Sequence, residues 1–84
     1  MRKERAMESL ISNIGKLHTT TLGEERIRRN LSLDAQDVVE WCRGLICDPN
    51  TVIEKRGKNW YASLKGTEIP VNSYSYTIIT AHKH

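Results

Sequence analysis

Apolar residues recur every three or four positions in the first part of the chain. Between residues 4 and 17 the apolar positions are Met7, Leu10, Ile11, Ile14 and Leu17. This spacing places them on one face of an amphipathic helix. His18 follows on the same face, one turn past Ile14, and Thr19–Thr21 are expected to end the helix.

Two further helices are predicted from their capping residues. Thr21 and Glu24 have the spacing of a capping box, so a second helix is expected to begin after Thr21. Asp34 is a suitable N-cap for a third helix. That helix should end at Asp48–Asn50, because this segment contains Pro49. The apolar positions of these helices are Leu22, Ile27 and Leu31, and then Val38, Val39, Trp41, Cys42, Leu45 and Ile46.

After Pro49 the hydrophobic period changes from helical to alternating, which is typical of strands. Pro70 cannot donate a backbone hydrogen bond, so its strand is expected to be an edge or irregular strand with Pro70 pointing outward. Thr77, Ile78 and Ile79 allow burial on both faces, which suits a central last strand. The four expected strands are Thr51–Lys55, Asn59–Leu64, Glu68–Asn72 and Tyr74–Ala81, with turns at Arg56–Lys58, Lys65–Gly66 and Asn72–Ser73.

Helices followed by an antiparallel meander predict an α+β fold. We expect a single domain over residues 1–84, with a helical part at 1–48 and a β part at 49–84. Two or three N-terminal helices should pack on one face of a four-stranded antiparallel β-meander. The side chains expected in the core include Trp41, Trp60, Ile69, Val71 and Ile78.

The composition is that of a small globular protein, with 38% hydrophobic and 27% charged residues. A chain of 84 residues can build one modest core but hardly a deep cleft. No apolar run is long enough to span a bilayer, and the basic start of the chain lacks the apolar core of a signal peptide. We therefore expect a cytoplasmic protein with no membrane partner, in which Cys42 and Cys47 are reduced thiols.

Positive charge and aromatic residues gather in the last third of the chain. Residues 55–84 carry five Lys or Arg against one acid, whereas residues 1–54 carry eight against nine. Basic groups attract phosphates and aromatic faces stack on unpaired bases, so this portion is a candidate for binding nucleic acid. The alternative is a half-buried sheet with lysines on its solvated side. The candidate nucleic-acid-binding residues are Lys55, Arg56, Lys58, Tyr61 and Tyr76.

Several residues have the chemistry that RNA cleavage without a metal requires, namely a base, an acid and a cation. His18 and His82 are the candidates for proton transfer, and Arg28 is a candidate cation. Tyr76 and Thr80 should alternate onto the same face of the last strand as His82. The alternative is structural: His18 caps a helix or packs on the sheet, and His82 is a solvated strand end.

No metal site and no cofactor are predicted. Cys42, Cys47, His82 and His84 are four potential ligands, but the cysteine spacing matches no common zinc knuckle. Cys42 also lies on the apolar face of a predicted helix, where a buried free thiol is the simpler interpretation.

Four segments resemble a family of short bacterial and phage-borne proteins that is defined only as a domain of unknown function. They are Leu17–Thr20, Asp37–Cys42, Gly57–Tyr61 and Ser75–Lys83, and the resemblance extends over nearly the whole chain. The resemblance implies membership of that family but no activity.

More distantly, helices followed by a four-stranded antiparallel sheet look like the barnase, colicin and RelE-like ribonuclease superfamily, many members of which are toxins. That resemblance implies a site of basic residues, histidines and polar residues near the last strand. His18, Arg28, Thr80 and His82 match it in kind.

Two hypotheses about function follow. The first is nucleic-acid binding, with RNA as the expected partner, extending to a toxin-like, metal-independent endoribonuclease. The second is a protein-interaction module without catalysis, such as a phage accessory factor or inhibitor that docks on a protein partner or forms a homodimer.

Overall fold

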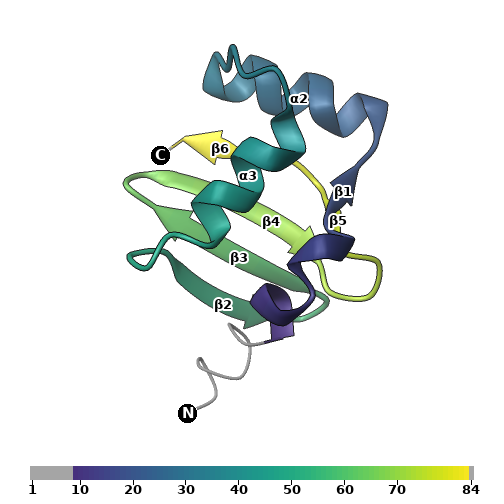
Figure 1. Cartoon of the computed structure of the whole chain (residues 1–84), viewed down its shortest axis with the longest axis vertical. Coiled ribbons are helices and arrows are strands. Elements are labelled where there is room, and N and C mark those ends of the chain that lie inside the picture. The colour runs from purple at the N-terminus through teal and green to yellow at the C-terminus, as the bar shows by residue number, and fades with distance from the viewer. Residues whose placement is uncertain (1–8, 84) are drawn as a thin grey trace.

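A mixed β-sheet forms the middle of the molecule, and helices cover one of its faces (Figure 1). The computed structural model describes residues 9–83, so positions 4–8 of the predicted first helix and His84 lie outside the described residues. Residues 9–12 are helical, followed by the short 3-10 helix η1 (Ile14–Lys16). The other elements are β1 (His18–Thr19), α2 (Thr21–Leu31), α3 (Val38–Ile46), β2 (Val52–Arg56), β3 (Asn59–Leu64), β4 (Thr67–Asn72), β5 (Thr77–Ile78) and β6 (His82–Lys83).

The described strands are arranged in the order β1-β5-β4-β3-β2, and β6 pairs with β4 beyond the end of β5. The two hairpins β2–β3 and β3–β4 are antiparallel, as predicted. β1 is parallel to β5, with His18 opposite Thr77 and Thr19 opposite Ile78. The predicted α+β class is therefore confirmed, but the four-stranded antiparallel meander is wrong, because the sheet is mixed and has additional short strands.

Pro70 explains why the predicted last strand is divided into β5 and β6. The Pro70 carbonyl accepts a hydrogen bond from the Ile79 N–H at 3.0 Å, so the backbone nitrogen of Pro70 faces the same side. This nitrogen has no hydrogen to donate. The chain leaves the ladder after Ile79 and pairs with β4 again only where His82 meets Glu68. The prediction that Pro70 lies in an edge strand is wrong, since β4 has neighbours on both sides. Its side chain lies on the sheet face opposite Ile69 and Val71, as predicted, but it is buried there.

The segment before β5 is a turn rather than a strand. The Asn72 side-chain oxygen accepts hydrogen bonds from the backbone N–H groups of Tyr74 and Ser75, at 2.9 and 3.0 Å. Tyr76 then has a positive φ of 59°. Because Tyr74–His82 does not form one continuous strand, the predicted alternation of Tyr76, Thr80 and His82 onto one strand face is wrong.

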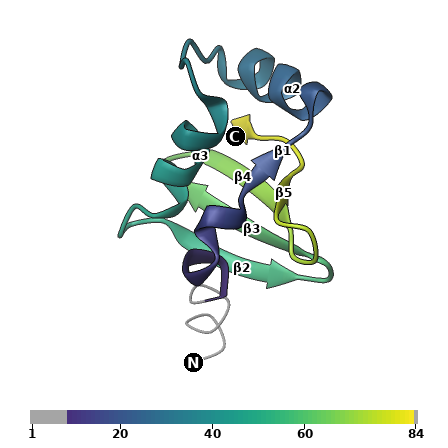
Figure 2. The same ribbon diagram turned by 45° about the vertical axis from the view of Figure 1, so that its right-hand side comes forward.

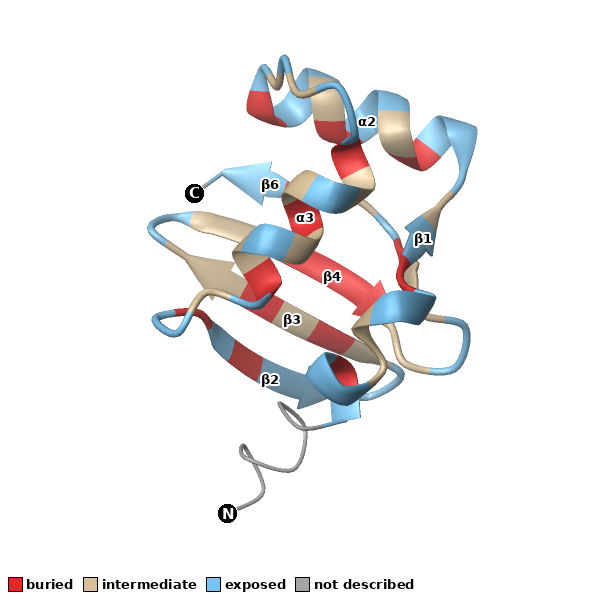
Figure 3. Ribbon diagram, viewed as in Figure 1, coloured by how far each residue is buried: buried red, intermediate tan, exposed pale blue. Residues whose placement is uncertain are grey.

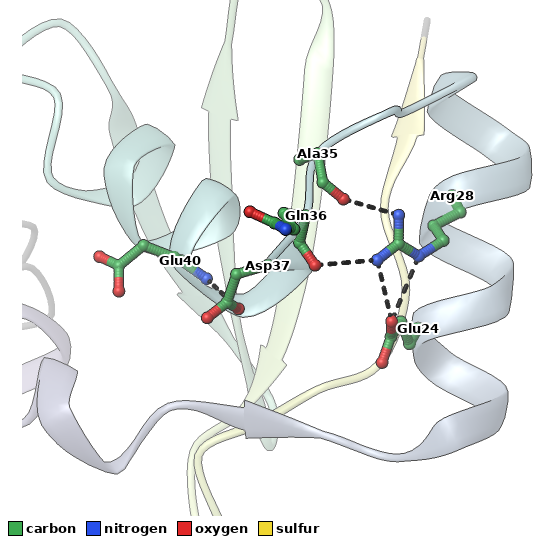
Figure 4. A network of polar contacts seen from close by, with 6 residues as sticks. All are labelled: Glu24, Arg28, Ala35, Gln36, Asp37 and Glu40. Carbon is green, nitrogen blue, oxygen red and sulfur yellow. Dashed lines mark hydrogen bonds and ion pairs between the residues drawn. The ribbon is translucent and has the colours of Figure 1, made fainter.

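Helices α2 and α3 begin at caps other than those predicted. The Thr20 hydroxyl accepts from the Gly23 N–H at 3.0 Å, which caps α2 one residue earlier than expected. The Asp37 carboxylate caps α3 by accepting from the Glu40 N–H at 3.1 Å (Figure 4). Asp34 is not the cap, because Arg28 of α2 holds Ala35 and Gln36 in a loop by hydrogen bonds to their carbonyl groups.

The core lies between the helices and the sheet face that they cover (Figure 3). Trp60, Ile69, Val71 and Ile78 are buried as predicted. Trp41 is only half-buried and packs at the margin of the core, so its predicted burial is wrong. Leu22 also fails as a core position of α2, since it is 54% exposed and the buried positions of that helix are Gly23, Ile27 and Leu31.

The two cysteines occupy different environments. Cys42 is buried in the core, and the desolvation caused by burial raises the pKa of its thiol to about 12. Cys47 is exposed at the end of α3, and both thiols are free. The Cys42 thiol therefore stays protonated at neutral pH and acts as a small apolar side chain. Within residues 9–83, no helix has the length and apolar character needed to cross a membrane.

Candidate nucleic-acid interface

The β2–β3 turn and the loop between β4 and β5 lie side by side at one end of the sheet in both views (Figure 1 and Figure 2). The Ser73 N–H donates a hydrogen bond to the Lys58 carbonyl at 2.8 Å, which joins the two loops. Gly57 has a φ of +60°, a value that lets the β2–β3 hairpin close with two residues. β1 reaches the same end, since the His18 N–H donates to the Tyr76 carbonyl at 3.1 Å.

Basic side chains gather at this end of the sheet. Lys55 and Arg56 are the last residues of β2, and Lys58 lies in the adjoining turn. The Lys16 ammonium lies 5.4 Å from the centre of the Tyr76 ring, and that ring lies 5.3 Å from the Trp60 ring. We call the end of the sheet that carries Lys16, His18, Lys55, Arg56 and Lys58 the basic end.

A chain of polar groups runs across the basic end. Nδ1 of His18 lies 2.9 Å from the Lys16 carbonyl oxygen, which can only accept, so Nδ1 carries a hydrogen. Nε2 of His18 lies 3.1 Å from the Thr77 hydroxyl, which lies 2.7 Å from the Ser75 hydroxyl. The Ser75 hydroxyl also reaches the Asn72 side-chain oxygen at 3.1 Å. His18 is thereby held in one orientation at the surface beside two hydroxyl groups.

This arrangement provides hydrogen-bond donors and positive charge but no deep pocket of titratable groups. His18, Ser75 and the basic side chains of β2 are exposed, and Thr77 is half-buried. Exposed lysines, an imidazole and hydroxyls are the usual partners of phosphate oxygens in nucleic-acid complexes. The sequence alone did not indicate a site role for Ser75, Thr77 or Lys16. Asn72–Ser73 was recognised there as a turn, but no sequence pattern indicated that β1 would pair beside it.

Arg56 and Tyr61 lie on the sheet face opposite the helices. In the sheet register, Arg56 pairs with Asn59 and Tyr61 pairs with Pro70. The Arg56 guanidinium carbon lies 4.1 Å from the centre of the Tyr61 ring. Its nitrogens face two carboxylates, Glu68 at 3.5 Å and Glu54 at 3.9 Å. Arg56 is therefore fixed over an aromatic ring even though its side chain is 59% exposed.

The structure does not bring the two predicted catalytic histidines together. His18 pairs with Thr77, directly before the Ile78–Val71 pair, whereas His82 pairs with Glu68. Val71 and Glu68 are three residues apart on β4, which corresponds to roughly 10 Å along the strand. His82 is exposed on β6, beside a carboxylate rather than within the basic end.

Thr80 lies between β5 and β6, where α2 passes close to the chain. The Asn30 side-chain amide donates to the Thr80 hydroxyl at 3.3 Å and to the Ala81 carbonyl at 3.0 Å. These contacts attach α2 to the segment that leaves the sheet. The position of Thr80 is therefore explained by packing, and the residue lies apart from His18.

Arg28 connects α2 to the loop before α3 (Figure 4). Its guanidinium donates to the Glu24 carboxylate at 3.1 and 3.2 Å, to the Ala35 carbonyl at 2.7 Å and to the Gln36 carbonyl at 3.3 Å. If α3 began after Asp34, the carbonyls of Ala35 and Gln36 would instead accept hydrogen bonds from N–H groups further along that helix. Arg28 thus explains the late start of α3, and its donors are directed at protein acceptors.

Among residues 9–83, no three His, Cys, Asp or Glu side chains come close enough together to form a metal site. Cys42 and Cys47 lie at the core and at the end of α3, while His82 lies on β6. His84 lies outside the described residues.

Comparison with known proteins identifies the family but no activity. Neither the curated proteins nor the solved structures contain a match, so the resemblance to the ribonuclease superfamily gains no support. One family model, described as "Protein of unknown function (DUF3781)", matches residues 11–82. The match includes every strand but the last residue of β6, and all of the basic end. The chain therefore belongs to the DUF3781 family.

Proposed function

We propose that this protein binds nucleic acid, with RNA as the expected partner, through the basic end. The observation that carries the proposal is the hydrogen bond from the Ser73 N–H to the Lys58 carbonyl. It joins the loop carrying the Ser75 hydroxyl to the turn that follows Arg56. Because the same loop carries Tyr76, whose ring lies 5.4 Å from the Lys16 ammonium, Lys16 and Lys58 come to the same end of the sheet, which suits a polyanion that contacts several cations at once.

The distribution of charge supports this proposal. Among residues 9–83, no carboxylate forms an ion pair with Lys16, Lys55 or Lys58, whereas Arg56 contacts Glu54 and Glu68. In the helical layer, by contrast, Arg28 pairs with Glu24 and Arg43 pairs with Glu40. Three cations of the basic end are therefore available to a ligand, as are the exposed Arg26 and Arg29 of α2 outside it.

The first test compares two lysines at opposite ends of the sheet. Lys58 lies in the β2–β3 turn, and Lys65 lies in the β3–β4 turn. We expect Lys58→Gln to weaken binding of a short single-stranded RNA several-fold and to reduce the slope of log K against log salt by about 0.7, because one phosphate contact is lost. Lys65→Gln removes the same charge and should leave both quantities close to those of the wild type. Fluorescence anisotropy over a salt series measures both.

Two results would count against the proposal. Wild-type protein that shows no salt-dependent affinity for RNA or DNA would remove its physical basis. Equal losses in the Lys58 and Lys65 variants would mean that binding reflects net charge rather than the basic end.

The proposal concerns binding rather than cleavage. Acid–base catalysis by two histidines requires both rings within hydrogen-bond reach of the reacting phosphodiester. His18 and His82 are separated along β4, and His82 lies outside the basic end. The ribonuclease hypothesis would accordingly rest on His18, with Lys16 or Lys58 as the cation.

A second candidate function is that of a protein-interaction module, and one observation favours it. β2 is the outermost strand of the described sheet, and Val52 on it is 51% exposed. Such an edge can accept an additional strand from a partner or from a second copy. A partner bound in this way would protect the outward-facing amides of β2 from hydrogen exchange, whereas RNA at the basic end would leave them unprotected.

A further inference from the structure

The Arg56 guanidinium is a planar group that already lies against one aromatic ring. Its central carbon is 4.1 Å from the centre of the Tyr61 ring, a distance typical of stacking. Tyr61 is half-buried in β3, the middle strand of the β2–β3–β4 part of the sheet, so the ring is a fixed support.

Two carboxylates occupy part of the hydrogen-bonding edge of this guanidinium. Its Nη2 lies 3.5 Å from Glu68 and its Nε lies 3.9 Å from Glu54. A phosphate that approached in the plane of Arg56 would meet these negative charges, so this residue is poorly placed as a phosphate ligand. The side chain is nevertheless 59% exposed. What it offers to a ligand is its planar face.

We infer that Arg56, supported by Tyr61, is a stacking platform for an unpaired nucleobase, and that the ligand is single-stranded RNA. This inference rests on the proposed function and adds to it the class of nucleic acid. Unpaired bases stack on arginine planes and aromatic rings, whereas bases inside a duplex have no free face. The lysines of the basic end would hold the adjoining phosphates, since Lys58 follows Arg56 by two residues.

The test separates base stacking from phosphate binding. Arg56→Lys keeps the charge but removes the plane. We expect it to lower the affinity for a single-stranded RNA about tenfold, the effect of losing one base–side-chain stack. It should leave the affinity for an abasic strand with the same number of phosphates unchanged. Wild-type protein should bind the base-bearing strand more tightly than the abasic strand or a duplex of equal length.

A matched variant tests the support beneath Arg56. Tyr61→Phe keeps the ring and should bind like the wild type, whereas Tyr61→Leu should reproduce the loss seen with Arg56→Lys. Thermal unfolding of each variant confirms that the fold is intact.

Three outcomes would overturn the inference. The first is equal affinity of the wild type for base-bearing and abasic strands. The second is an Arg56→Lys variant that binds base-bearing RNA as tightly as the wild type. The third is an Arg56→Lys variant that loses equal affinity for the base-bearing and the abasic strand. In each of these the proposed function still stands, because salt-dependent binding is retained. Absence of salt-dependent binding to any of the probes would overturn both.

Discussion

Replacing Gly23 by alanine is expected to destabilise the protein by about 3 kcal/mol. A Cβ atom at Gly23 would lie 2.3 Å from the Thr19 hydroxyl oxygen and 3.4 Å from the Ile78 carbonyl oxygen. The Thr19 hydroxyl donates a hydrogen bond to that carbonyl at 2.8 Å. The added methyl group must therefore either displace α2 from the β1–β5 pair or break this hydrogen bond.

Gly44 in α3 provides the matched control for Gly23. A Cβ atom at Gly44 would meet no other atom within 4 Å. Gly44→Ala should stabilise the protein by about 0.5–1 kcal/mol, because alanine loses less backbone entropy in a helix. Both effects are measured as changes in the free energy of unfolding by urea denaturation. Adding Thr19→Ala to Gly23→Ala should recover part of the loss, and a Gly23→Ala variant as stable as the wild type would contradict the described packing.

The second large effect is expected at Arg28. Arg28→Gln should reduce the free energy of unfolding by about 2 kcal/mol, because a charged donor to the carbonyls of Ala35 and Gln36 is lost. The ion pair with Glu24 adds little to this figure, since both side chains are partly exposed.

Arg29, the next residue of α2, is the control for Arg28. It is exposed, and Arg29→Gln should change the free energy of unfolding by less than about 0.5 kcal/mol. Urea denaturation measures the free energy of unfolding of both variants. It thereby compares Arg28, which is hydrogen-bonded to the loop, with Arg29, which is exposed on the same helix. If the Arg28→Gln variant were as stable as the wild type but bound RNA less tightly, Arg28 would be a phosphate ligand rather than a residue that stabilises the loop before α3.

The parts of the fold that the sequence predicts well depend on contacts between neighbours in the chain. The two hairpins follow from alternating apolar residues and from Gly57 and Gly66, both of which have positive φ. α2 and α3 follow from helical periodicity and nearby capping residues. Such signals involve only a few neighbouring residues, so predictions made from them err by small shifts of a helix or strand end.

The errors in the predicted fold arise from contacts between distant residues. No local pattern shows that His18–Thr19 would pair in parallel with Thr77–Ile78, since a two-residue strand has no period. Pro70 was expected to lie in an edge or irregular strand, but its effect falls on the neighbouring segment after Ile79 rather than on its own strand. Arg28 delays the start of α3 through hydrogen bonds to residues seven and eight positions away.

The predictions for the candidate site also succeed where they depend on nearby residues and fail where they depend on distant contacts. The basic and aromatic residues of β2 and β3 were predicted as binding residues from composition and spacing, and Arg56 and Tyr61 do contact each other. The association of His18 with Thr77 depends on the β1–β5 pair and could not be predicted. Tyr76 was expected on the same strand face as Thr80 and His82, yet its backbone has a positive φ and its ring contacts Trp60 and Lys16.

Backbone amide chemical-shift mapping during titration with a short single-stranded RNA tests the proposed function most directly. We expect the largest shifts on three separate segments that meet only at the basic end, residues 16–19, 56–59 and 73–77. Amides of the β3–β4 turn at Lys65–Gly66 and of α3 should stay unchanged, and the shifts should disappear as salt is added. Shifts centred on α3 or on the β3–β4 turn, or no shifts at low salt, would contradict the proposal that the basic end binds nucleic acid.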